Sequence, residues 1–341
     1  MVEKRLRRPF IVALHGLPYF SAKLARLLRN ERWDVRFRFG LSARDLAVYA
    51  NDLRRCDLAY TWGGRISMGK FLWAARCFRK KRIVMLWSGS DVMYARQEFA
   101  EGKMVPWIAR MTHWAVSPWI AEEVRTMGLR CEYIQASFVN PVGEPKPLPE
   151  KFSVVAYVAS IEKKDLYGWD RIVEVASALP SVEFNIVGLQ PGQVLEGPAN
   201  INVHSRVEDA APFIERATVL YRPVRHDGLS FMVLETLAQG RHVLYSYPLP
   251  ACIQVRDTEM AIKELQRLHA LHDSRTLTRN EAGMQFIARD YAPEKVRAEI
   301  LRRWEEIIVP SCADLRGGVR GGIGSGVPAL TGPAESSGSD D

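Results

Sequence analysis

The chain has 341 residues, 47% of them hydrophobic and 25% charged, a length and composition that suggest two soluble domains of about 150 residues each. Its apolar runs are shorter than the roughly 20 residues that cross a membrane. Its five cysteines are scattered and include no C-x-x-C pair, and this pattern argues for a reducing, cytoplasmic location. The net charge of +8 favours phosphate-rich partners and leaves nucleotides, nucleic acid and anionic lipid all open.

Strand and helix signals alternate over the first part of the chain. Short apolar runs predict strands, amphipathic stretches predict helices, and Ser21 is a suitable N-cap for the first helix. The strands fall at 10–14, 35–39, 58–62, 82–87 and 112–115, and the later helices at 43–56, 68–78 and 118–127. Strands joined by helices form right-handed β-α-β units around a parallel sheet. We therefore expect residues 1–145 to form one Rossmann-like domain.

A proline-rich stretch, Asn140–Glu150, then predicts a linker. Behind it the alternation resumes, with strands at 154–158, 183–187, 201–204, 218–221 and 242–246 and helices at 170–179, 212–216, 230–239, 258–272 and 293–308. We expect a second Rossmann-like domain over 146–292, a helix within 293–312 that returns to the N-terminal domain, and a disordered tail over 313–341. The predicted fold class is α/β, with two doubly wound parallel sheets that face each other across a cleft.

The segment Tyr221–Ser246 carries the most specific chemical signal. A strand ends at Arg222, and Gly228 permits a tight turn with close backbone approach. A helix then begins, and the free N–H groups at its start, from Leu229 and Ser230 onward, form a site for an anion such as a phosphate.

Two carboxylates bracket this helix start. Asp227 and Glu235 lie about two helical turns apart on one face, roughly 10 Å along the axis. That is about the length of a diphosphate with a sugar at either end. We expect Asp227 to bind hydroxyls of a transferred sugar and Glu235 to bind a ribose diol. The alternative is that Glu235 is a solvated helix residue and Asp227 a turn former.

This segment resembles the GT-B retaining glycosyltransferases of the GT4-type group, in which an E-x7-E motif precedes an A-x-G-x-P-V stretch. Here the match is Asp227-x7-Glu235, then Ala238-Gln239-Gly240-Arg241-His242-Val243. Tyr167-Gly168-Trp169-Asp170 is similar to the group's K-G-x-D helix start, and Trp87-Ser88-Gly89-Ser90-Asp91-Val92 to its W-x-G-S-D-V loop. The resemblance covers about residues 10–308, and it implies that residues 1–145 form the acceptor-side domain and residues 146–292 the nucleotide-sugar-binding domain. It implies transfer of a sugar from a nucleotide-diphosphate-sugar donor to a glycan or lipid-linked acceptor, with retained configuration and without a metal or other cofactor.

Two cations that grip the donor diphosphate in that family are missing from their usual places, where this chain has Ser160-Ile161 and Tyr167. Four nearby cations could replace them: Arg222, Arg225, Lys163 and Lys164. Gly16, in a His-Gly-Leu turn after the first strand, is a reduced form of the family's glycine-rich first loop. We accordingly assign catalysis to Asp227 and Arg222, and donor binding to Gly228, Leu229, Ser230, Glu235, Lys163, Lys164, Arg225 and Gly16.

Two other classes of protein stay open. The absence of the two diphosphate-binding cations from their usual places favours a non-catalytic relative that binds a nucleotide sugar or acts as an assembly partner. The positive charge permits a nucleic-acid-binding or nucleic-acid-modifying protein, although we do not expect nucleic acid as the partner. The sequence has no D-x-D motif and no His or Cys spacing typical of a metal site, so no metal is expected.

A basic, aromatic stretch offers a second interpretation of the charge. Phe71-Leu72-Trp73 leads into Arg76, Arg79, Lys80, Lys81 and Arg82. A basic amphipathic helix of this kind can lie on an anionic bilayer, which would make the protein peripheral at the inner face of the membrane. The alternative is a solvated helix face above a buried apolar stripe.

Overall fold

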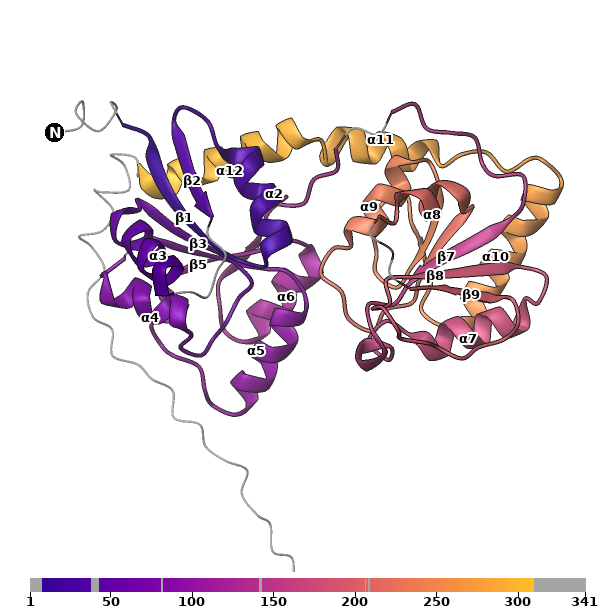
Figure 1. Cartoon of the computed structure of the whole chain (residues 1–341), viewed down its shortest axis with the longest axis horizontal. Coiled ribbons are helices and arrows are strands. Elements are labelled where there is room, and N and C mark those ends of the chain that lie inside the picture. Colours follow the sequence, from indigo (N-terminus) through magenta and orange to yellow (C-terminus); the bar gives the residue numbers. More distant parts are fainter. Residues whose placement is uncertain are drawn as a thin grey trace, which may run out of the picture.

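The computed structural model describes residues 8–37, 43–80, 82–140, 143–205, 207 and 209–309. The predicted tail, 313–341, and Lys81 of the basic stretch lie outside these residues. The described residues form two domains side by side, each a parallel sheet of six strands with helices on both faces (Figure 1). The predicted α/β class with two Rossmann-like sheets is confirmed. None of the described helices is long and apolar enough to cross a membrane.

The N-terminal sheet has the strand order β2-β1-β3-β4-β5-β6. Its strands β3 (Leu58–Trp62) and β4 (Ile83–Trp87) are buried at every position, because helices cover both faces of the sheet. The other strands are β1 (Phe10–Gly16), β2 (Trp33–Phe37), β5 (Thr112–Ala115) and β6 (Cys131–Tyr133). The helices are α2 (Pro18–Leu28), α3 (Ala43–Arg55), α4 (Lys70–Cys77), α5 (Ser90–Ala100) and α6 (Pro118–Thr126), with a short 3-10 helix η1 (Ile108–Arg110).

The C-terminal sheet has the order β12-β11-β10-β7-β8-β9. Its strands are β7 (Ser153–Tyr157), β8 (Glu183–Val187), β9 (Ile201–His204), β10 (Val219–Arg222), β11 (His242–Tyr245) and β12 (Ile253–Gln254). Its helices are α7 (Trp169–Ala178), α8 (Ala211–Arg216), α9 (Phe231–Ala238), α10 (Thr258–Asp273) and α11 (Glu281–Asp290), with a 3-10 helix η2 (Ile161–Lys163). The apolar core between α2 and its sheet is continuous with the core under α9 and α11.

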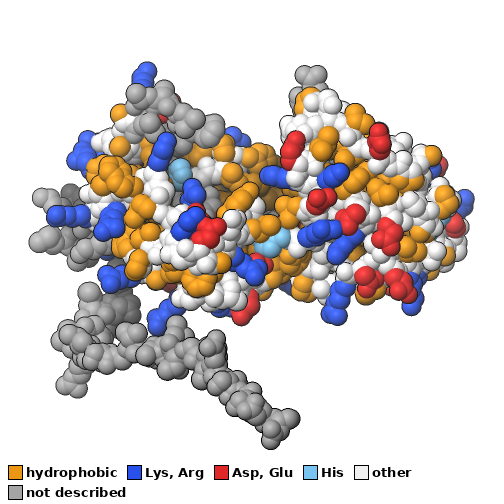
Figure 2. All heavy atoms as spheres, turned by 90° about the horizontal axis from the view of Figure 1, so that it is seen from below, with side chains coloured by type: hydrophobic (Ala, Val, Ile, Leu, Met, Phe, Trp, Pro, Cys, Tyr) orange, Lys and Arg blue, Asp and Glu red, His pale blue; other side chains and the backbone are white. Residues whose placement is uncertain are grey.

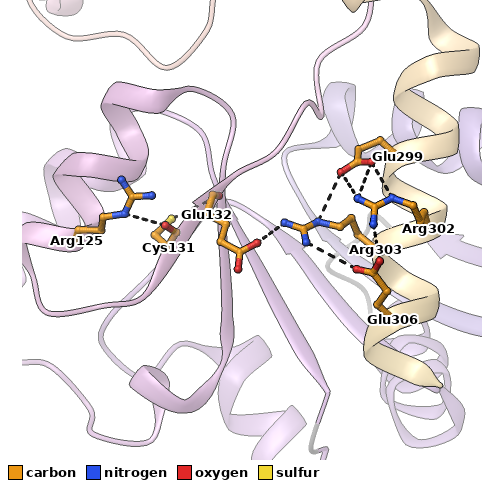
Figure 3. Close-up of polar contacts among 7 residues, drawn as sticks. All are labelled: Arg125, Cys131, Glu132, Glu299, Arg302, Arg303 and Glu306. Atoms are coloured by element: carbon orange, nitrogen blue, oxygen red, sulfur yellow. Dashed lines mark hydrogen bonds and ion pairs between the residues drawn. The ribbon is translucent and has the colours of Figure 1, made fainter. Parts of the chain in front are cut away.

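The last helix, α12 (Pro293–Ile308), returns to the N-terminal domain. Its Trp304 is fully buried, with its ring centroid 5.6 Å from that of Trp33 and 5.4 Å from that of Tyr60. Arg303 forms ion pairs with Glu132 on the edge strand β6 and with Glu299 and Glu306 on its own helix (Figure 3).

The chain crosses between the domains at the 140–150 segment and again before α12. These two crossings touch, because the Val139 N–H donates a 3.0 Å hydrogen bond to the Tyr291 carbonyl. Any change in the angle between the domains must therefore act on these two connecting segments.

The first helix begins earlier than predicted. Pro18 is its first residue, a position that proline favours because the N–H it lacks would have no helical partner. Ser21, the expected N-cap, lies inside α2 with its hydroxyl buried. Helices α5 and α11 and strands β6 and β12 were not predicted.

Candidate functional site

Two glycines bring the domains into backbone contact. Ser88 and Gly89 follow β4, and Gly228 ends the turn after β10, so both loops extend from the carboxyl edges of their sheets. A Cβ atom on Gly228 would lie 1.7 Å from the Ser88 carbonyl oxygen, and one on Gly89 would lie 3.1 Å from the Gly228 nitrogen. No side chain fits between these loops, so the close approach of the two backbones requires a glycine at position 228.

The two residues predicted to catalyse, Asp227 and Arg222, contact each other at this junction. Arg222 Nε and Asp227 Oδ2 are 2.7 Å apart, with side chains only 8% and 14% exposed. The Tyr245 hydroxyl donates a 2.9 Å hydrogen bond to the same carboxylate oxygen. The Arg222 guanidinium also lies over the Tyr167 ring, 5.6 Å from its centroid. Burial disfavours the charged form of Arg222, but the charge and hydrogen bond of Asp227 outweigh it and raise the pKa.

The backbone of Asp227 is held from both domains. Its carbonyl accepts a 2.8 Å hydrogen bond from Trp119 Nε1, which comes from α6 of the N-terminal domain. Its N–H donates to the Tyr247 hydroxyl at 3.3 Å. The Trp119 and Tyr247 rings stack with centroids 4.9 Å apart. The turn is therefore fixed by residues that follow β11 and by a side chain of the other domain.

A hydrogen bond between side chains joins the domains next to this turn. His226 Nε2 lies 3.0 Å from Glu123 Oε2, and Arg96 lies 3.4 Å from the same oxygen. Burial disfavours ionisation of Glu123, but His226 and Arg96 together lower its pKa. The carboxylate form of Glu123 thus stabilises the closed junction.

The start of α9 is covered in this arrangement. Leu229 and Ser230 are buried, and the Ser230 hydroxyl accepts a 3.4 Å hydrogen bond from the Val233 N–H as the N-cap of the helix. The loop of Ser88 and Gly89 lies against the residue before them, and thus directly against the turn that precedes this helix start.

Glu235 lies in a different environment from Asp227. It is half-buried, and burial raises its pKa, while the charge of Lys23 on α2 lowers it and that of Asp209 raises it. Across the same junction, Phe20 of α2 stacks on Phe231 with centroids 5.3 Å apart. Glu235 therefore faces the other domain, and it has no charged or hydrogen-bonded partner in common with Asp227 among the described residues.

The remaining predicted cations surround the turn without joining it. Lys163 and Lys164 lie at η2, after β7, and their side chains have no hydrogen bond or ion pair with any described residue. Arg225 is half-exposed and pairs with Asp170 of α7 at 2.6 Å. Gly16 lies elsewhere, at the end of β1, where its φ of +138° and a Cβ position 2.3 Å from the Trp62 carbonyl both require glycine.

Gly16 lines a pocket of about 800 Å³ in the N-terminal domain, between the ends of β1, β3 and β4 and the helices α4 and α5. Asp91 forms part of its wall, and its carboxylate accepts hydrogen bonds from the N–H groups of Gly64, Ser88 and Gly89 at 2.7 to 3.1 Å. Burial raises the pKa of Asp91, and these three donors lower it. Asp91 thus fixes the loop that contacts Gly228.

The assignments from sequence had missed four side chains that shape the site: Trp119, Tyr245, Tyr247 and Asp91. Tyr245 ends β11 and Tyr247 follows it, at the sheet edge where doubly wound domains bind ligands, so position at a strand end was the available signal. The role of Trp119 depends on the placement of the other domain, and no local pattern indicates it. Among the described residues, no cluster of three or more His, Cys, Asp or Glu side chains could hold a metal ion.

No family model and no curated protein matches the chain. Solved structures do match. A sucrose-phosphate synthase from Thermosynechococcus elongatus superposes with a TM-score of 0.62 and 13% identity, over 89% of this chain and 100% of that one. The fold is GT-B. A glycosyltransferase from Rickettsia africae gives 0.60 and 11%, over 89% and 100% of the two chains. HepE from Anabaena, in complex with UDP and glucose, gives 0.59 and 10%, over 87% and 99%.

TarM also matches, with a TM-score of 0.57 and 11% identity over 78% of this chain, but the chain covers only 58% of TarM. At such identities the likeness establishes the two-domain fold and nothing finer.

Proposed function

We propose that the chain is a glycosyltransferase that moves a sugar from a nucleotide-diphosphate sugar to a glycan or lipid-linked acceptor. The observation that carries this proposal is the glycine contact between Gly89 and Gly228, which brings the carboxyl edges of two Rossmann-like sheets together at the start of α9. GT-B neighbours support it, since HepE is a complex with UDP-glucose and TarM one with UDP. A glycan acceptor is supported by the saccharides in that TarM complex.

In this proposal the donor lies on the C-terminal domain. The N–H groups at the start of α9 bind its phosphates, Asp227 binds hydroxyls of the transferred sugar, and Glu235 binds the ribose diol. The departing diphosphate gains negative charge, which nearby cations stabilise. The cations that surround the turn are Arg222, Arg225, Lys163 and Lys164. We expect retention of configuration and no metal.

Donor binding requires movement at the junction. The Ser88–Gly89 loop must leave the start of α9 before a phosphate can occupy it, and closure afterwards excludes water from the reaction. The contacts to be broken and remade are the Trp119 hydrogen bond and the pair of His226 with Glu123. The touching crossing segments at Val139 and Tyr291 form the hinge.

A second candidate is a non-catalytic relative that binds a nucleotide sugar or acts as an assembly partner. The observation that favours it is the ion pair of Arg222 with Asp227, in which the two predicted catalytic groups neutralise each other. Catalysis requires at least one of them to turn toward the donor.

We also propose reversible association with an anionic membrane surface. Helix α4 buries Phe71 and Leu72 and exposes Trp73, with Arg76 and Arg79 exposed near its end. Lys80 does not belong to this surface, because its Nζ donates to the carbonyls of Arg54 and Cys56.

The proposed function is tested by thermal-shift measurements with UDP, GDP, ADP and CDP, followed by turnover of the matching nucleotide sugars. Binding of one nucleoside diphosphate stabilises the protein by mass action, and its sugar conjugate is consumed. If none of the four stabilises the chain, the proposed function is wrong. Binding without turnover, hydrolysis included, would establish the non-catalytic alternative.

A further inference from the structure

The pocket of the N-terminal domain opens next to the junction. Its volume of about 800 Å³ is in the range of small-molecule sites. Ser88 lines it, and the carbonyl of the same residue lies against Gly228. A molecule in the pocket therefore reaches the place where the donor's sugar would lie.

Most of the pocket wall is apolar: Trp62, Phe71, Leu72 and Met85 come from β3, α4 and β4. A saccharide would need many hydrogen-bonding partners from such a wall, since buried hydroxyl groups without partners are costly. Transfer of a hydrocarbon chain from water to the same surface lowers the free energy.

Several polar groups of the wall are already paired. Thr61 Oγ1 donates to the Gly63 carbonyl at 3.1 Å, and Asp91 accepts from three backbone N–H groups. Glu98 accepts from the Ser67 hydroxyl at 2.7 Å and lies 3.5 Å from Arg65. The side chains of Thr61, Asp91 and Glu98 are therefore engaged with the protein itself.

The pocket mouth combines exposed apolar side chains with positive charge. Leu17 is 53% and Tyr94 66% exposed although both line the pocket. Arg65 and Lys70 of the wall are exposed. Such a surface fits the boundary between hydrocarbon and an anionic head group.

The positive charge of the chain is concentrated in this domain. Residues 1–145 hold 25 Lys and Arg against 13 Asp and Glu, a net charge of +12, although the whole chain carries only +8. In the view of Figure 2, Lys and Arg side chains dominate over the N-terminal domain, whereas both signs alternate over the C-terminal domain. An anionic partner is therefore attracted to this domain.

We propose that this pocket holds the hydrocarbon tail of an anionic, lipid-linked acceptor, an inference that rests on the proposed sugar transfer. The head group lies at the Ser88 end, beside Gly228, and Arg65 and Lys70 of the same pocket wall attract its negative charge. His15, stacked on Phe71 with centroids 5.0 Å apart, has no hydrogen-bond partner among the described residues and is available to the acceptor's hydroxyl.

The test compares hexadecyl phosphate with butyl phosphate as ligands of the full chain, by calorimetry below micelle formation. Gly69→Trp fills the pocket, because a Cβ there meets nothing nearer than the Arg65 Cδ at 3.6 Å. Tyr94→Ser removes apolar surface from the mouth without touching the core. Val194→Ser is the matched control, since Val194 is 71% exposed on the other domain.

We expect hexadecyl phosphate to bind at least about tenfold more tightly than butyl phosphate. Gly69→Trp and Tyr94→Ser should each remove about that factor, and Val194→Ser should leave the affinity unchanged. Equal affinities of the two phosphates, or hexadecyl binding that neither pocket variant alters, would overturn the proposal.

Nucleoside diphosphate binding, measured on the same proteins, separates this proposal from the proposed function. A parent chain that binds a nucleoside diphosphate but treats the two alkyl phosphates alike refutes the lipid tail and keeps sugar transfer. A chain that binds hexadecyl phosphate in the pocket but no nucleoside diphosphate refutes the acceptor role.

Discussion

Replacing Gly228 by alanine isolates the contact between the two domains. The φ angle of Gly228 lies outside the left-handed region, so alanine adds no backbone strain, and the whole effect comes from the new Cβ. That atom would lie 1.7 Å from the Ser88 carbonyl oxygen. Carbon and oxygen atoms in close contact are about 3.3 Å apart. The loops must therefore separate by more than 1 Å.

This separation breaks the contacts that close the junction. Two interdomain interactions depend on it, the Trp119 hydrogen bond to Asp227 and the pair of His226 with Glu123. At about 1 kcal/mol for each hydrogen bond, Gly228→Ala should lower the free energy of unfolding by about 2 kcal/mol. A displacement of about 1 Å at the reacting groups should also reduce turnover about 100-fold.

Denaturant unfolding and small-angle scattering measure both consequences. Gly228→Ala should unfold at lower denaturant concentration and scatter as a more open pair of domains. Gly143→Ala is the control, because a Cβ on Gly143 meets nothing within 4 Å. If Gly228→Ala unfolds and scatters like the parent chain, the close approach of the two loops is not a feature of the protein in solution.

The other predictions concern the donor, the cations and the membrane. Glu235→Ala should weaken nucleoside diphosphate binding by about 1.5–3 kcal/mol, whereas Asp227→Asn should spare the bare nucleotide and weaken its sugar conjugate; equal losses for both ligands would contradict these roles. Charge reversal by Arg76→Glu with Arg79→Glu should release the protein from anionic vesicles in co-sedimentation, at about 1 kcal/mol per residue, whereas Lys263→Glu on the other domain should not. Four single alanine variants test the cations that would bind the donor diphosphate: Arg222, Arg225, Lys163 and Lys164. At least one of these variants should reduce turnover about 100-fold with the fold intact, and full activity of all four would refute this role.

The regular elements were predictable where burial alone fixes them. Strand β3 and helix α12 have the bounds expected from sequence, because a strand buried on both faces is a short apolar run and a helix that begins with proline has a clear first turn. Helix α5 was missed because its start lies in a Ser-Gly-Ser loop. What orders that start is Asp91, whose carboxylate binds the N–H groups of the residues before the helix.

The candidate site was predictable only within one segment. Arg222 and Asp227 are five residues apart across a turn, so their proximity follows from the sequence, although their mutual ion pair does not. Glu235 was expected to share a ligand with Asp227, yet the charge that faces it is Lys23, more than 200 residues earlier and in the other domain. Local spacing carries no information about such a partner, because only the docking of the two domains brings it near.

Release of a nucleoside diphosphate from nucleotide sugars, with and without an added acceptor, tests the central claim most directly. The account predicts that one donor of a panel of UDP-, GDP-, ADP- and CDP-sugars is consumed, with slow hydrolysis alone and faster release when an acceptor is present. It also predicts that Gly228→Ala loses this release while Gly143→Ala keeps it. A chain that binds none of the nucleotides and consumes none of the donors would contradict the account.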